Sequence, residues 1–146
     1  MSEVANITID SKAVGQNIIA LAVQKFPDVA KKALHEAQKQ LKIDADEIPP
    51  RTPHLTGALR DSGVLGDPET HGETIEGTVA YTMPYAARWH EIGEEKITIG
   101  NAEYKTNSIN WSEAGVGPKY LEAKLVNLNQ KYLKLMADYI KSELGL

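Results

Sequence analysis

The C-terminal segment carries the strongest pattern in the chain and limits which folds are possible. From Leu121 to Tyr139, leucine and tyrosine recur at alternating spacings of four and three, as on one face of an amphipathic α-helix. Pro118 at the first position and Gly145 just past the end predict a helix of about 26 residues, or ~39 Å. Because a globule of 146 residues has a radius of gyration near ~15 Å, this helix must cross the whole domain.

The apolar face of this helix is wider than a single seam, since Met136, Ile140 and Leu144 extend it. A face of that width suits a helix that contacts its own sheet and a second surface. A long helix inside one core gives the same pattern, and the sequence leaves both readings open.

The N-terminal region predicts a short strand followed by a helix. Residues 6–9 alternate, with Ile7 and Ile9 on one side, as in a half-buried strand. Asp10 or Ser11 can cap the helix that follows. Its apolar positions are Val14, Ile18, Leu21 and Ala22.

Pro27 predicts the start of a second helix, because proline lacks the N–H that an interior position donates but fits the first turn. This helix must end before Pro49 and Pro50. Its apolar stripe is narrow enough to let a neighbouring backbone approach closely and consists of Ala30, Ala33, Leu34, Ala37 and Leu41.

The middle of the chain changes to the two-residue period of β-structure. Residues 74–81 alternate, with Ile75, Val79 and Tyr81 on one face, which predicts a half-buried antiparallel strand. Residues 64–65 are its expected partner, with Gly66-Asp67-Pro68 and Gly72 as turn residues. A hairpin is expected from 96–99 through a Gly100-Asn101 turn to a return strand at 103–106.

The composition excludes several classes of function. The chain has no cysteine, which removes thiolate nucleophiles, cysteine-ligated zinc, iron–sulfur clusters and disulfides. It has 16 Lys and Arg against 20 Asp and Glu, without the basic excess that sequence-independent binding of nucleic acid requires. No apolar run approaches the ~20 residues that cross a bilayer, and the first residues do not resemble a secretory signal. A protein of the cytosolic type is expected.

The net charge of −4 is unevenly distributed along the chain. Residues 49–116 carry five basic and ten acidic side chains, whereas residues 117–146 carry five Lys and three acids. An acidic surface within an assembly and a set of solvated loops both explain the acidic middle.

No arrangement of side chains specifies an active site. No two histidines have the spacing that places two metal ligands on one helix face, and an enzyme built on His54 and His90 is the catalytic alternative. The acids Asp44, Asp46 and Glu47 lie near a predicted helix end, where solvent is expected to surround them. The expectation is a protein without enzymatic activity, cofactor or metal.

Three motifs stand outside these periodic patterns: Arg51-Thr-Pro-His-Leu-Thr-Gly-Ala-Leu-Arg-Asp-Ser62, Pro84-Tyr-Ala-Ala-Arg-Trp-His-Glu-Ile-Gly93 and Gly117-Pro-Lys-Tyr-Leu-Glu122. In this order they resemble the small neck and tail-completion proteins of long-tailed bacteriophages, a family of head–tail joining and minor capsid proteins. The resemblance spans residues 30–145. The residues that carry it are Thr52, Pro53, Thr56, Gly57, Leu59, Arg60, Ser62, Pro84, Tyr85, Ala86, Glu91, Gly93, Gly117, Pro118, Tyr120 and Leu121.

The resemblance implies a small antiparallel sheet with helices packed on one face. Together with the predicted elements it gives a single α+β domain over residues 1–146, with a long C-terminal helix and an extended hairpin. The chain departs from the family pattern in the strand and helix extension at residues 1–26 and in the hairpin arm at 94–111, which is longer than expected for the family. The motif residues themselves suit fold-defining roles. Thr56 can cap the turn that Gly57 begins, and Tyr85, Ala86 and Trp89 can close one end of the sheet.

The implied function is that of a structural virion protein. Copies would form a ring, expected to be a hexamer, that ends the tail tube and joins it to the head. The implied partners are the tail tube protein and connector or stopper proteins, while DNA passes through without sequence-specific binding and no membrane is involved. The alternatives are a head-completion or minor capsid protein bound to the connector, a small His-dependent metalloenzyme, and a nucleic-acid-binding accessory protein.

Overall fold

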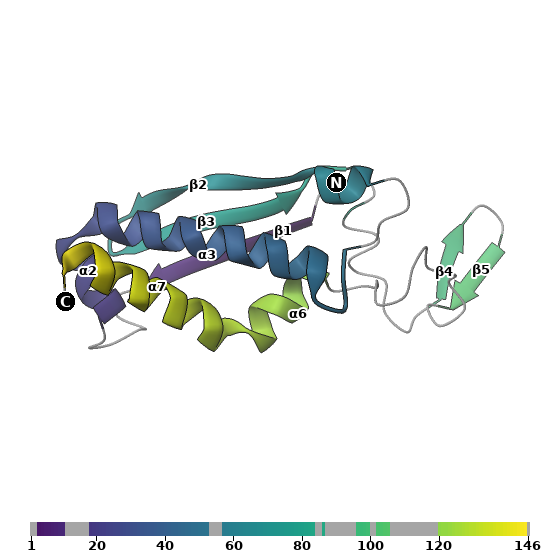
Figure 1. Ribbon diagram of the computed structural model, residues 1–146. Coiled ribbons are helices and arrows are strands. Elements are labelled where there is room, and N and C mark those ends of the chain that lie inside the picture. Colours follow the sequence, from purple (N-terminus) through teal and green to yellow (C-terminus); the bar gives the residue numbers. More distant parts are fainter. Residues whose placement is uncertain are drawn as a thin grey trace.

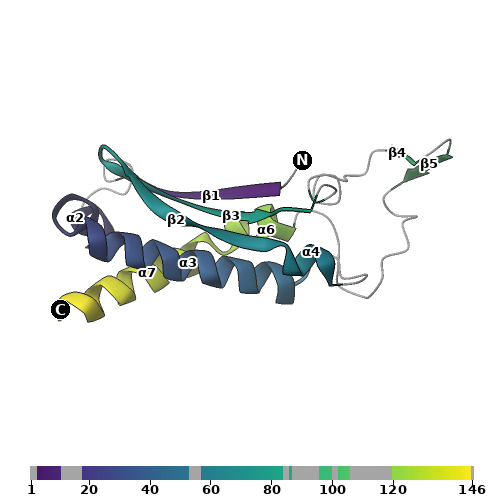
Figure 2. The same cartoon turned by 90° about the horizontal axis from the view of Figure 1, so that it is seen from above.

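The computed structural model describes residues 3–10, 18–52, 57–83, 86, 96–99, 102–105 and 120–145. The described part contains a three-stranded antiparallel sheet, a separate two-stranded hairpin and a layer of helices. Figure 2 shows the helices on one side of the three-stranded sheet, and Figure 1 shows the hairpin beyond its end. The predicted α+β class, a small antiparallel sheet with helices on one face, is confirmed.

The sheet has the order β1-β3-β2, with β3 (Thr74–Tyr81) between β1 (Glu3–Asp10) and β2 (Gly63–His71). Alternate residues of β3 are buried, and Ile75, Val79 and Tyr81 are among them as predicted. β1 pairs with β3 over its whole length, and its Ile7 and Ile9 enter the core. The N-terminal segment is therefore an integral edge strand of the sheet.

The turn predicted at Gly66-Asp67-Pro68 was wrong. These residues lie within β2, where the register with β3 shifts between Gly66 and Glu69. Pro68 cannot donate to a strand ladder, and a bulge on an edge strand accommodates it. The turn between β2 and β3 lies instead at the other predicted position, Gly72, whose φ is +62°.

Helix α3 (Pro27–Glu47) covers the inner face of the sheet and begins and ends where the prolines predicted. The predicted stripe from Ala30 to Leu41 is fully buried. Gln38 lies among these residues, and its Nε2 donates to the carbonyl oxygens of Gly66 (2.7 Å) and Thr78 (2.8 Å). A Cβ on Gly77 would stand 2.7 Å from Gln38 Cδ, so glycine at this position leaves room for the buried Gln38 amide in its hydrogen-bonded place.

The short helix α2 (Ile18–Lys25) is rotated relative to the prediction. Ala22 is buried as expected, but Leu21 is 41% exposed, and Ile19 and Val23 take the inner positions. Ile19 and Val23 are four residues apart, as are the predicted Ile18 and Ala22, so spacing alone does not decide which pair faces the core. Packing against the rest of the fold decides it. The predicted helix start near Ser11 and Val14 lies outside the described residues.

The C-terminal segment crosses the domain as two helices, and the prediction of one continuous helix was wrong. Leu128, with φ −114° and ψ 18°, separates α6 (Tyr120–Asn127) from α7 (Asn129–Leu144). Asn127 and Asn129 flank the break, and asparagine side chains compete with the hydrogen bonds of a helix backbone. Gly145 ends α7 in the left-handed region, with φ 70°, as predicted.

The predicted hairpin is present as β4 (Lys96–Ile99) and β5 (Ala102–Lys105). The two strands pair antiparallel, with Ile99 opposite Ala102, so a two-residue connection joins them as expected. Its return strand starts one residue earlier than predicted. Figures 1 and 2 place the hairpin at the end of the molecule opposite the C-terminus.

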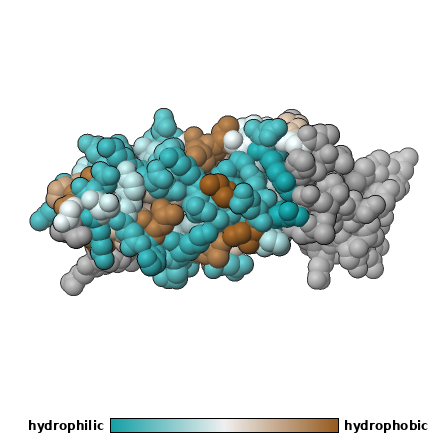
Figure 3. All heavy atoms as spheres, in the orientation of Figure 1, coloured by the Kyte–Doolittle hydropathy of each residue, from teal (hydrophilic) through white to brown (hydrophobic). Residues whose placement is uncertain are grey.

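On the face drawn in Figure 3, hydrophobic side chains form separate patches among hydrophilic ones. The large apolar side chains that are exposed on the molecule include Ile43, Ile48 and Val126. Scattered apolar residues of this kind are normal on a folded surface and specify no binding site by themselves. In the part of the chain that the structure describes, no helix combines the length and apolarity needed to span a membrane.

Candidate functional site

Residues of the first and third motifs meet around Tyr81, the last residue of β3. Tyr81 is fully buried, and its hydroxyl donates to Asp46 Oδ1 at 2.6 Å. The hydroxyl of Thr52 in the first motif lies 3.1 Å from that of Tyr81. The ring of Tyr120 in the third motif meets the Tyr81 ring edge-on, with 5.3 Å between centroids. Tyr81 thus joins the end of α3 to two motifs that are far apart in the sequence.

The first motif folds back onto the end of α3 through Thr52. The buried Thr52 donates its backbone N–H to the carbonyl oxygen of Ala45 at 2.8 Å. Arg60, which follows in the same motif, donates from Nε to the carbonyl oxygen of Thr52 at 2.8 Å. These contacts close the motif on itself and fix its position against the helix.

The turn α4 (Ala58–Asp61) begins at Gly57, whose φ of 83° lies in the left-handed region that favours glycine. The N-cap residue of α4 is Gly57, whereas the sequence predicted Thr56 as the cap. Thr56 itself lies outside the described residues. Leu59 is buried, and Ser62 Oγ donates to its carbonyl oxygen at 2.7 Å. The carbonyl oxygen of Ser62 accepts the N–H of Thr82 at 3.2 Å, which ties the turn to the end of β3.

The second and third motifs meet at Ala86 and Tyr120. The Tyr120 hydroxyl donates to the carbonyl oxygen of Ala86 at 3.0 Å, and both residues are fully buried, as is Leu121. We call the set Thr52, Tyr81, Ala86 and Tyr120 the motif junction. The other predicted residues of interest lie outside the described part of the chain: Pro53, His54, Thr56, Pro84, Tyr85, Trp89, His90, Glu91, Gly93, Gly117 and Pro118.

Asp44 is buried at 2% exposure, so the prediction that solvent surrounds it was wrong. Its Oδ2 accepts hydrogen bonds from Lys131 Nζ and the Tyr132 hydroxyl, each at 2.8 Å, and its Oδ1 accepts one from Gln40 at 2.8 Å. Burial raises the pKa of this carboxyl, but the hydrogen bonds outweigh burial and the net pKa lies below its ordinary value. The signal that could have revealed Asp44 is its spacing from Leu41, which continues the buried stripe of α3.

Lys124 is a second buried charge, 2% exposed, and no sequence pattern pointed to it. Its Nζ donates to the carbonyl oxygens of Pro50 (2.7 Å) and Tyr120 (3.3 Å). Burial lowers the pKa of Lys124 to about 8, although the carboxylates of Asp44 and Asp46 act in the opposite direction. Lys124 therefore anchors the chain after α3 to α6, next to the motif junction.

Two hollows of the described surface are not lined by Asp44 or Lys124 themselves. A groove of about 270 Å³ runs between β1 and α6–α7, and a hollow of about 280 Å³ lies beside Lys31, Lys32 and His35. Neither is lined by Asp44, Asp46 or Lys124. Among the described residues no group of three His, Asp or Glu could hold a metal ion. The hydrogen bonds of Asp44 join α3 to α7, and those of Lys124 join α6 to the chain after α3.

Comparison of the chain with protein-family models, with curated proteins and with solved structures found no match.

Proposed function

We propose that the protein is a structural virion component of a tailed-phage neck, a tail-completion ring without enzymatic activity that ends the tail tube and joins it to the head. The observation that carries this proposal is that residues of three motifs distant in sequence build one motif junction around Tyr81. Figure 1 places the β4–β5 hairpin beyond this end of the sheet. The motif junction thus lies at the end of the sheet that is nearer the hairpin.

A ring of identical copies needs two different surfaces that contact each other head to tail. One such surface is the β4–β5 hairpin at one end of the domain. Another is the face of the three-stranded sheet opposite the helices, which the helices leave uncovered (Figure 2). On that face Val4 of β1 and Val64 of β2 are 44% and 47% exposed. Both pair with Ala80 of the central strand β3, one from each side. These features support assembly through unlike surfaces.

The exposed charges of the sheet suit a channel through which DNA passes without adhering. Glu69 and Glu73, near the turn between β2 and β3, are exposed. Carboxylates repel the phosphate backbone, and binding that depends on phosphate contacts requires Lys and Arg instead. The expected site of action is the virion neck, after assembly in the host cytoplasm.

The proposal is tested by mixing the purified protein with isolated tail tubes and with connector-bearing heads from a phage that encodes it, followed by sedimentation. Co-sedimentation with tail tubes is the expected result. Co-sedimentation with the heads alone would support the head-completion alternative. Binding to neither would overturn a role in the neck.

A further inference from the structure

The outer face of the three-stranded sheet, opposite the helices, changes character along its length. Near the motif junction, Val4 and Val64 flank Ala80 of the central strand and are 44% and 47% exposed. Four residues earlier on β3 the same face carries Glu76, because alternate residues of a strand share a face. The outer face is therefore apolar at one end and acidic towards the other.

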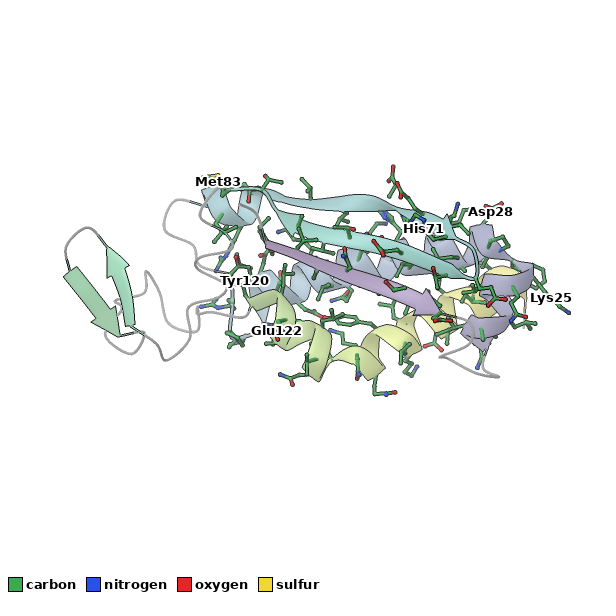
Figure 4. All side chains as sticks on the ribbon, turned by 180° about the vertical axis from the view of Figure 1, so that it is seen from behind. Lys25, Asp28, His71, Met83, Tyr120 and Glu122 are labelled. Carbon is green, nitrogen blue, oxygen red and sulfur yellow. The ribbon has the colours of Figure 1, made fainter. Side chains whose placement is uncertain are left out.

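The acidic end of this face has no lysine or arginine of its own. Neither residue type occurs in residues 3–10 or 63–81, which form the three strands and the turn between β2 and β3. The register places Glu69 directly opposite Glu76, and like charges in such a pair are unfavourable. His71, which marks this end of the sheet in Figure 4, lies 3.6 Å from Glu69 and offsets the repulsion only when protonated. A lysine placed against this end would relieve it.

Helix α3 exposes a stripe with the complementary order. Ile43 is 45% exposed, Lys32 is exposed, and the ion pair of Lys39 with Glu36 lies between them. These four positions are three or four residues apart and therefore share one face of the helix. Among the residues that the structure describes, Lys32 has no ion-pair or hydrogen-bond partner. The stripe thus offers an apolar side chain towards one end and a cation without a partner towards the other.

The two patterns also match in spacing. Along an α-helix the distance from Lys32 to Ile43 is ~16 Å, and along a strand the distance from Glu76 to Ala80 is ~13 Å. The difference of ~3 Å lies within the reach of a flexible lysine side chain. When Ile43 lies against Ala80, Lys32 therefore reaches Glu76.

We propose that α3 of one copy packs on the outer sheet face of the next copy, with Ile43 against Ala80 and Lys32 facing Glu76. The inference rests on the proposed ring and names a pair of unlike surfaces that would form it. The sheet then has helices on both faces, and the exposed valines beside Ala80 are removed from water. Glu69, on the edge strand, stays at the rim of the contact.

The direction of α3 suits a head-to-tail contact. Within one copy, later residues of α3 contact later residues of β3, as the hydrogen bonds of Gln38 with Thr78 and of Asp46 with Tyr81 show. In the proposed contact α3 of the neighbour follows β3 in the same direction, so successive copies keep one orientation. Repeating such a contact closes a ring when the rotation per copy allows.

The size of the face favours a ring over an isolated pair. Strands of eight residues span ~26 Å and three strands side by side span ~14 Å, so the outer face covers roughly 400 Å². A stable pair of proteins buries ~800 Å² on each partner. In a closed ring each copy makes the contact twice, once through its sheet and once through its α3.

Disulfide trapping tests this contact, because the chain contains no cysteine. A chain with both Ile43→Cys and Ala80→Cys is oxidised, and the linked chains are resolved on a non-reducing gel. Within one copy the two positions lie on opposite outer faces of the helix and sheet layers, so a bond between them joins different copies. Thr78→Cys replaces Ala80→Cys in a parallel sample, to cover a shift of two residues along β3. Ala80→Cys with Lys134→Cys, on α7 at 77% side-chain exposure, is the matched control.

A charge exchange tests the polar end of the same contact. Lys32→Glu, added to the chain with both cysteines, should lower the yield of linked chains about threefold. Adding Glu76→Lys to that chain should restore the yield, because each contact then pairs opposite charges again. A yield that stays low after Glu76→Lys would overturn the pairing of Lys32 with Glu76.

The expected result is a series of linked chains, at least tenfold more abundant with Ile43→Cys than with the Lys134→Cys control. Equal yields in all samples, while light scattering shows that the unmodified protein is a multimer, would overturn this contact and leave the ring in place. The sheet face would then be left to another neck protein. An unmodified protein that is monomeric at every concentration would overturn the ring and this contact together.

Discussion

Replacing Tyr81 with Phe removes one hydroxyl from the motif junction and keeps the aromatic ring. That hydroxyl is buried, donates to Asp46 at 2.6 Å and lies 3.1 Å from the Thr52 hydroxyl. A hydrogen bond to a charged group contributes about 1.5–3 kcal/mol net. Asp46 keeps its ion pair with Lys42, so we expect a loss of about 2 kcal/mol, which at this chain length lowers Tm by roughly 6–8 °C.

The assay is urea unfolding followed by circular dichroism, with thermal scans on the same samples. Tyr139→Phe is the matched control, since Tyr139 is only half-buried on α7, and its loss should stay within about 0.5 kcal/mol. Equal losses for the two variants would refute the role assigned to the Tyr81 hydroxyl. A loss above ~4 kcal/mol would also contradict it, because it would mean that the ring packing against Tyr120 had changed.

Three further predictions concern single positions. Gly77→Ala places a Cβ 2.7 Å from Cδ of Gln38, and urea unfolding should show that the free energy of unfolding falls by about 2 kcal/mol. In a Gln38→Ala background this fall should largely disappear. An equal fall in both backgrounds would contradict the steric argument. Gly57→Val forces a β-branched residue to φ 83° and should cost more than ~1 kcal/mol, so an unchanged Tm would count against it. Burial lowers the pKa of Lys124 from 10.5 to about 8, so between these values the folded chain binds fewer protons than the unfolded chain and stability should rise with pH from 8. Lys124→Met should remove that rise, and identical slopes for the two proteins would show that Lys124 is not its source.

The elements that were predicted correctly are those whose signal is local. Pro27 and Pro49 bracket α3, and the alternation along β3 already identifies which of its side chains face the core. Each of these patterns lies within one helix or strand, where backbone geometry alone relates residue spacing to a face. The hairpin is a similar case, because two strands joined by a short turn are neighbours in the sequence.

The features that were missed depend on partners far away in the sequence. Gln38 contacts the bulge at Gly66 over a separation of 28 residues, and Asp44 meets Tyr132 over 88 residues. The spacing of Asp44 from Leu41 continues the buried stripe of α3, but that spacing does not identify the partners of the carboxylate. The packing of α7 against α3 brings the Tyr132 hydroxyl to it.

The candidate site was predictable only in part. The motifs named Thr52 and Tyr120 as fold-defining residues, and periodicity placed Tyr81 on the inner face of its strand. The meeting of these three side chains depends on how the chain after α3 and the start of α6 reach the end of the sheet. That convergence is a property of the tertiary fold, and it identifies Tyr81 as the centre of the motif junction.

The proposed assembly of this chain into a ring is tested by the mass of the purified protein in solution. Light scattering over a concentration series, combined with electron microscopy of the same sample, measures both stoichiometry and shape. We predict a mass six times the 16.0 kDa of one chain and ring-shaped particles. A mass of 16.0 kDa at every concentration, with no rings in the images, would contradict assembly into a ring.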